Sequence, residues 1–131
     1  MEIIRAPIRT SNDVVHARQL VRRGAQEAGL SLVDQTKIVT AASELARNTL
    51  THGLGGEMTM EVVNAGARRG VRLTFVDQGP GIPDMKLALT DGWTSGNGLG
   101  MGLSGARRLV NDFEIESRVG EGTRVSVARW K

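Results

Sequence analysis

The sequence predicts a single domain over residues 1–131, an α/β (α+β) two-layer sandwich with helices on one face of a mixed, mostly antiparallel sheet. Three observations support this prediction. The predicted elements follow the order β-α-α-β-β-loop-α-β-β, the helical segments repeat apolar residues with the 3.6-residue period, and the strand segments alternate apolar and polar residues. The length of 131 residues suits one domain, and no repeat or linker divides the chain.

The first half of the chain is predicted to contain one strand and two helices. Residues 2–8 alternate loosely, as a short edge strand does. Residues 11–13 offer N-cap side chains for a helix that ends at Gly29. A second helix is predicted over residues 33–51, closed by Gly53. Its apolar face comprises Ile38, Val39, Ala42, Leu45, Ala46 and Leu50.

The second half is predicted to supply the remaining strands and one more helix. The expected strands are 58–63, 71–76, 113–118 and 123–130, with a turn at 67–70 and a helix at 100–111. Residues 77–98 are rich in glycine and proline and show no regular period. A domain this small seldom keeps so long a loop without a functional reason.

Composition excludes several classes of function. The chain has no cysteine, which rules out disulfides and thiolate metal sites. No signal-peptide pattern and no stretch of about 20 apolar residues is present, so a cytoplasmic protein with no membrane association is expected. The net charge of +3 would suit nucleic acid, but two Phe, two Trp and no Tyr leave few rings for stacking on bases, and we expect no nucleic-acid partner.

Glu44 and Asn48 are four residues apart on the second predicted helix and therefore share a face. A carboxylate can accept a proton from a hydroxyl group, and an amide oxygen is a neutral ligand that Mg²⁺ accepts. A solvated polar pair is the simpler reading of such spacing. Asparagine is a mediocre helix former, however, and its place in mid-helix favours a functional reason.

Asp77 ends a predicted strand and is followed by Gly79 and Gly81. A carboxylate at a strand end can accept a hydrogen bond from an exocyclic amino group such as that of adenine. Glycines there let the backbone approach a flat ring. Taken alone, this segment could also be an Asx turn stiffened by prolines.

The run Gly98-Leu99-Gly100-Met101-Gly102 opens the third predicted helix. Free backbone N–H groups at a helix start form an anion site, which suits phosphates. The segment from Gly100 to Gly105 also fits a dinucleotide-binding G-x-G-x-x-G pattern. That alternative fails because a long loop precedes the pattern where a strand is required.

Together the three segments resemble the N, G1 and G2 boxes of the GHKL ATP-binding superfamily, and most closely its small anti-sigma-factor-type serine/threonine protein kinases. The resemblance implies ATP and Mg²⁺ as cofactors and a lid at residues 84–98. It makes Glu44 the general base and Asn48 the Mg²⁺ ligand. The implied nucleotide contacts are Asn48, Asp77, Gly79, Gly81, Gly98, Leu99, Gly100, Met101, Gly102 and Thr123.

The resemblance also implies partners and leaves two functions open. The first is a kinase that phosphorylates Ser or Thr of a STAS-domain antagonist protein and also engages a PP2C-type phosphatase. The second is a nucleotide-gated anti-sigma or phosphatase-activating binding module with little catalysis. Related kinases often carry a lid arginine, whereas this lid offers only Lys86. Mg²⁺ then has to neutralise most of the charge on the transferred phosphate, with Lys86 or Arg47 as candidate helpers between which the sequence does not decide.

Overall fold

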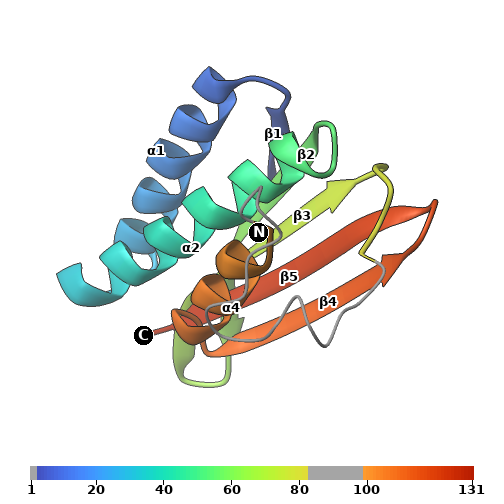
Figure 1. Cartoon of the computed structure of the whole chain (residues 1–131). Helices are drawn as coiled ribbons and strands as arrows, with labels where there is room; N and C mark the ends of the chain where they lie inside the picture. Colours follow the sequence, from blue (N-terminus) through green and yellow to red (C-terminus); the bar gives the residue numbers. More distant parts are fainter. Residues whose placement is uncertain (1–2, 83–98) are drawn as a thin grey trace.

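The computed structural model describes residues 3–82 and 99–131, which form three helices and five strands (Figure 1). Each predicted element is present in the predicted order. The bounds are β1 Ile3–Ile8, α1 Ser11–Glu27, α2 Leu32–Thr51, β2 Gly56–Ala65, β3 Arg68–Asp77, α4 Leu99–Arg108, β4 Asp112–Arg118 and β5 Gly122–Trp130.

The five strands form one sheet in the order β1-β2-β3-β5-β4, and the helices cover one of its faces (Figure 1). The two-layer class is confirmed. Every neighbouring pair of the described strands is antiparallel, so the parallel pairing that a mixed sheet would contain is not found among them. The last strand of the chain, β5, lies inside the sheet between β3 and β4. It brings Thr123 opposite Asp77.

The N-cap of the first helix lies one residue before the predicted N-cap residues 11–13. Thr10 caps α1, because its hydroxyl accepts from the Asp13 backbone N–H at 3.2 Å. The Asp13 carboxylate accepts in return from the backbone N–H groups of Thr10 and Arg9. Together the two side chains form a capping box, which satisfies backbone donors that a helix start leaves free.

The predicted turn at residues 67–70 is wrong. Strand pairing continues to Ala65 opposite Arg68, and the chain reverses at Gly66, whose φ of +61° lies in the left-handed region. Arg68 is therefore a strand residue. Its guanidinium lies 5.1 Å from the ring centre of Trp130, a cation–π contact.

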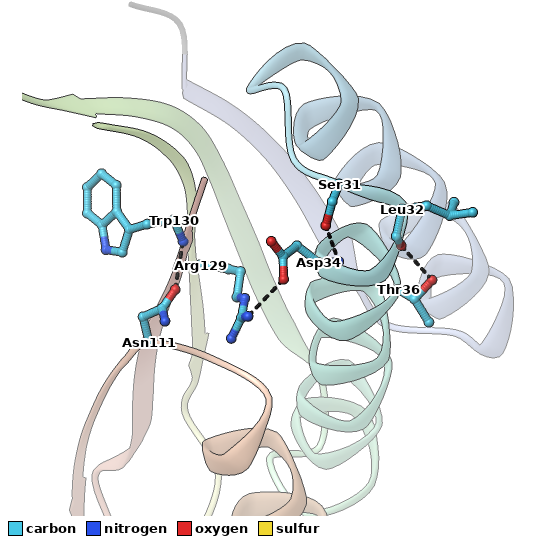
Figure 2. Close-up of polar contacts among 7 residues, drawn as sticks. All are labelled: Ser31, Leu32, Asp34, Thr36, Asn111, Arg129 and Trp130. Atoms are coloured by element: carbon cyan, nitrogen blue, oxygen red, sulfur yellow. Dashed lines mark hydrogen bonds and ion pairs between the residues drawn. The ribbon is translucent and has the colours of Figure 1, made fainter. Parts of the chain in front are cut away.

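The last helix ends at Arg108, three residues before the predicted end at Asn111. Asn111 is held by the sheet instead. Its backbone N–H donates to Ala128, and its side-chain oxygen accepts from the Trp130 backbone N–H at 2.8 Å (Figure 2). A contact with a distant strand thus overrides the local helical pattern.

The hydrophobic core lies between the helices and the sheet and is mainly aliphatic. The strand face predicted at Val71, Leu73 and Phe75 is fully covered. Leu45 of α2 and Leu103 of α4 are buried in the same core. No helix in the described part of the chain is long and apolar enough to cross a membrane.

An ion pair ties the end of β5 to the start of α2 (Figure 2). Nη2 of Arg129 lies 2.8 Å from Oδ1 of Asp34, and both side chains are largely buried. The hydrogen bond from Arg129 is the main reason that the pKa of Asp34 lies below its ordinary value of 3.8. The helical layer is thus joined to a central strand by a charged contact as well as by the core.

Replacing Asp34 by Asn is expected to lower the free energy of unfolding by about 1 kcal/mol near neutral pH, because Arg129 loses a charged acceptor. The lowered folded pKa means that this contribution is fully present above pH 3.8 and is lost as the pH falls through the folded value. Urea unfolding of both proteins between neutral and strongly acidic pH should show the difference shrinking. A difference that stays constant across that range would contradict the assignment.

Candidate functional site

A small pocket forms where the C-terminal ends of α2 and β3 meet the start of β5. The predicted site residues Asn48, Asp77, Gly81 and Thr123 all line it. The remaining lining residues are Leu45, Thr49, His52, Gly53, Phe75, Ile82, Leu103 and Val125. Its volume is about 30 Å³, room for about two water molecules, so the space that these residues enclose is smaller than a purine ring.

Asp77 is the buried carboxylate of this pocket, with 9% of its surface exposed. Its Oδ1 accepts a hydrogen bond of 2.9 Å from the backbone N–H of Gly79. Burial raises the pKa of Asp77 above its ordinary value, and the backbone N–H groups of Gly79 and Thr123 oppose that shift. A partly desolvated carboxylate with one oxygen already held can offer its other oxygen to a ligand donor.

Asn48 contributes an amide without a protein partner. Its side-chain nitrogen is buried and makes no hydrogen bond within the described part of the chain. A buried polar group without a partner costs about 1–3 kcal/mol, so it is normally satisfied by a ligand or a water. Rotation of the amide by half a turn presents its oxygen at the same place, which is the donor atom that Mg²⁺ prefers.

The described residues contain no group of three or more His, Asp or Glu that could hold a metal ion by themselves. A magnesium ion at Asn48 would therefore need ligands beyond those that the described residues supply. Phosphate oxygens and water are the usual ones, since Mg²⁺ is commonly bound through one or two protein groups plus substrate phosphates. The residues present fit a metal that arrives with a nucleotide.

Glu44 lies one helical turn before Asn48 but does not line the pocket. Its side chain is 39% exposed, and its Oε1 lies 4.0 Å from Nη1 of Arg47. An ion pair this long and this exposed contributes little to stability. The carboxylate is thus available beside the pocket, at the point where the same helix face reaches solvent.

Two glycines let the α2–β2 connection approach the strand end closely. A Cβ on Gly53 would lie 2.3 Å from the carboxyl carbon of Asp77, and a Cβ on Gly79 would lie 2.7 Å from Cα of Gly53. Gly81 has a φ of +79°, and a Cβ there would lie 2.3 Å from the Arg118 carbonyl oxygen. Gly79 therefore packs against Gly53 and does not line the pocket, whereas Gly81 does.

The glycine-rich run enters α4 at its first turn. Leu99, Gly100, Met101 and Gly102 belong to that turn. Gly98, Lys86 and the predicted lid at 84–98 lie outside the described residues. Further along α4, the buried side chain of Leu103 lines the pocket, so this helix start adjoins Asn48 and Asp77.

Sequence reasoning missed several pocket residues. Thr49 follows Asn48 in the last turn of α2, and His52 and Gly53 come just after its end, so their closeness in sequence to Asn48 could have indicated them. Ser117, which contacts the pocket residues Thr123 and Ile82 without lining the pocket itself, carried no such signal. Its hydroxyl lies 2.7 Å from that of Thr123 and accepts from the Ile82 backbone N–H at 2.8 Å, which joins β4 to the segment after β3.

Comparison with known proteins identifies the class. Residues 33–131 match the histidine kinase-, DNA gyrase B- and HSP90-like ATPases. This match covers most of the chain, so the protein belongs to that family, and the GHKL resemblance is confirmed.

Within this class the chain is similar to two kinds of bacterial regulator. It is 43% identical over 123 residues to the serine/threonine-protein kinase RsbT of Bacillus subtilis (strain 168), covering 94% of this chain and 92% of that one. It is 27% identical over 120 residues to the anti-sigma F factor of Thermoanaerobacter sp. (strain X514), covering 87% and 82%.

Solved structures show the same fold. The RsbU and RsbW domains of Rv1364c from Mycobacterium tuberculosis superpose with a TM-score of 0.67 and 20% identity. That match covers all of this chain and 33% of the other, so the chain spans a third of that structure's length. The catalytic domain of the histidine kinase ThkA gives a TM-score of 0.55 and 16% identity, covering 100% and 99%.

Proposed function

We propose that this chain is a serine/threonine protein kinase that transfers the γ-phosphate of ATP to a Ser or Thr of a STAS-domain antagonist protein. The observation that carries the proposal is the meeting of a buried aspartate and an unpartnered asparagine amide in one pocket, Asp77 and Asn48. The 43% identity to RsbT supports the reaction class. We further propose that the chain switches between the STAS-domain protein and a PP2C-type phosphatase as partners, and so regulates stress or sigma-factor signalling.

Each proposed role follows from the chemistry of the residue. Asp77 accepts a hydrogen bond from the adenine amino group, and Thr123 opposite it supports the same end of the ring. Asn48 holds Mg²⁺, which neutralises phosphate charge. The N-terminal turn of α4, with Gly98 before it, binds the phosphates through backbone N–H groups.

Glu44 is proposed to accept the proton of the acceptor hydroxyl. The hydroxyl oxygen then bonds to the γ-phosphorus while the bond to the bridging oxygen of ADP breaks. The pair formed by Glu44 and Arg47 places a cation next to the base. Arg47 is our candidate for the positive charge that related kinases take from a lid arginine.

The decisive experiment is direct. Purified protein, labelled ATP, Mg²⁺ and a STAS-domain protein from the same organism are incubated together, and label on a Ser or Thr of the STAS-domain protein is the expected result. ATP binding without transfer would instead favour the nucleotide-gated binding module. Two observations favour this second function. The chain is similar to anti-sigma F factors, and Glu44 does not line the pocket.

Replacing Asn48 by Ala is expected to abolish Mg²⁺-dependent ATP binding, because the only protein ligand proposed for the ion is removed. The change should not destabilise the fold strongly, since the amide nitrogen has no partner to lose. Calorimetry with and without Mg²⁺ measures the effect, and Asn64→Ala, at an exposed strand end, is the matched control. Unchanged, Mg²⁺-dependent affinity in Asn48→Ala would refute the metal role.

A further inference from the structure

A basic groove runs along α1 and reaches α2, and it shares no lining residue with the pocket at Asn48 and Asp77. Val15, Arg18, Arg22 and Arg23 of α1 line it together with Val39 of α2. Val15, Arg18 and Arg22 are three and four residues apart and Arg23 is adjacent to Arg22, so the lining positions form one stripe along the helix. The opposite face of α1 is buried in the core, which leaves this one on the surface.

The positive charge of the groove is not neutralised within the described part of the chain. No carboxylate there forms an ion pair with Arg18, Arg22 or Arg23. Of the acidic side chains on α1 and α2, Asp13 caps α1, Asp34 binds Arg129 and Glu44 lies near Arg47, while Glu27 makes no ion pair in the described part of the chain. The groove therefore presents three cations to an incoming partner.

Apolar side chains lie within the same groove, and a further one is exposed on α2. Val15 is 50% exposed, and Val39 forms part of the floor. Leu32 precedes Val39 by seven residues on α2, on the same helix face, and is 72% exposed. Figure 2 shows its side chain pointing away from Arg129 and the interior. Cations beside an apolar strip are the complement of a helix with an apolar stripe flanked by carboxylates.

We propose that this groove docks an acidic amphipathic helix of a partner protein. A helix is favoured over nucleic acid because valines and no aromatic ring line the groove, so bases would find no stacking surface. The apolar positions would contact the helix stripe, and the arginines would pair with its carboxylates and speed association. Docking here requires neither ATP nor phosphoryl transfer, so it adds a surface to the proposed kinase site.

The test uses the full chain and a synthetic helical peptide of about 18 residues, with leucines on one face and glutamates beside them. Calorimetry should show binding that weakens as salt is raised. The charge reversals Arg22→Glu and Arg23→Glu together, and separately Val15→Asp, should each weaken binding by about tenfold or more. NMR shifts should concentrate on α1.

Matched controls separate docking from general attraction. The double variant Arg72→Glu and Arg124→Glu changes the charge equally on the strands β3 and β5, and it should bind the peptide within about twofold of the original protein. A peptide of the same composition with scrambled leucines should bind about tenfold more weakly. Unaltered ATP affinity in the groove variants shows that they fold.

Three results would overturn the proposal. The first is no binding of the helical peptide. The second is equal binding of the scrambled one. The third is that single-stranded DNA binds as tightly as the peptide and that Val15→Asp does not change peptide binding. That result would make the groove a general surface for polyanions. None of these results would bear on the kinase assay, because the peptide experiment contains no nucleotide.

Discussion

Replacing Glu44 by Gln is expected to slow phosphate transfer to the partner protein by about 10²–10⁴-fold while ATP and partner binding stay near normal. The amide keeps the shape of the side chain but cannot take the proton of the attacking hydroxyl. Glu44 lies outside the pocket lining and makes only a long ion pair with Arg47, so little binding energy is lost. Single-turnover transfer of labelled phosphate, with calorimetry for ATP, separates the two effects.

The matched control is Glu27→Gln at the end of α1, another exposed helical carboxylate. It should transfer phosphate at the original rate. If Glu44→Gln also does so, the carboxylate is not the base. The nucleotide-gated binding module then becomes the better description of the chain.

Replacing Asp77 by Asn is expected to weaken ATP binding by about 10- to 100-fold or more. The Gly79 N–H holds one oxygen of Asp77, so the amide of Asn would keep its oxygen there. Its NH₂ group would then occupy the place of the other oxygen. A donor would face the adenine amino donor, and both would be left without an acceptor. Calorimetry with Mg²⁺ and ATP measures the loss, and original affinity in the variant would refute the adenine contact.

The same substitution should stabilise the protein without nucleotide at neutral pH. Burial raises the folded pKa of Asp77 above 3.8, so below 3.8 the aspartate is protonated in both states and burial costs no ionisation energy. As the pH rises through the interval between the unfolded and folded values, the original protein loses stability that the Asn variant keeps. Melting temperatures should therefore diverge from acid to neutral pH. A variant that melts lower at pH 7 would show that the carboxylate is structural.

Periodicity predicted the helices and strands because each of them buries one face in a common core. Val71, Leu73 and Phe75 alternate in sequence and are buried together. The errors arose where a local signal met a stronger non-local one. The sequence near Arg68 is typical of a turn, but pairing with β2 makes it part of a strand. Asn111 accepts a hydrogen bond from Trp130 on another strand, and no local pattern indicates that contact.

The candidate site was predictable to the extent that single side chains carry unusual chemistry. Asn48 in mid-helix and Asp77 at a strand end attract attention by themselves, and the structure brings them to one pocket. Ser117 could not be predicted, because a serine alternating in a hairpin is ordinary and its bond to Thr123 depends on the pairing of β4 with β5. Residues 83–98 lie outside the described part, and the role proposed for the lid stays a prediction.

The insertion of β5 between β3 and β4 sets a limit on when the pocket can exist during synthesis. Asp77 is made early, but its neighbour Thr123 belongs to the last strand of the sheet. Until residues 122–130 have left the ribosome, β3 has a free edge and the pocket lacks one wall. Before that point a nascent chain cannot gain stability from a ligand in this pocket, and the edge of β3 stays open to pairing with other chains.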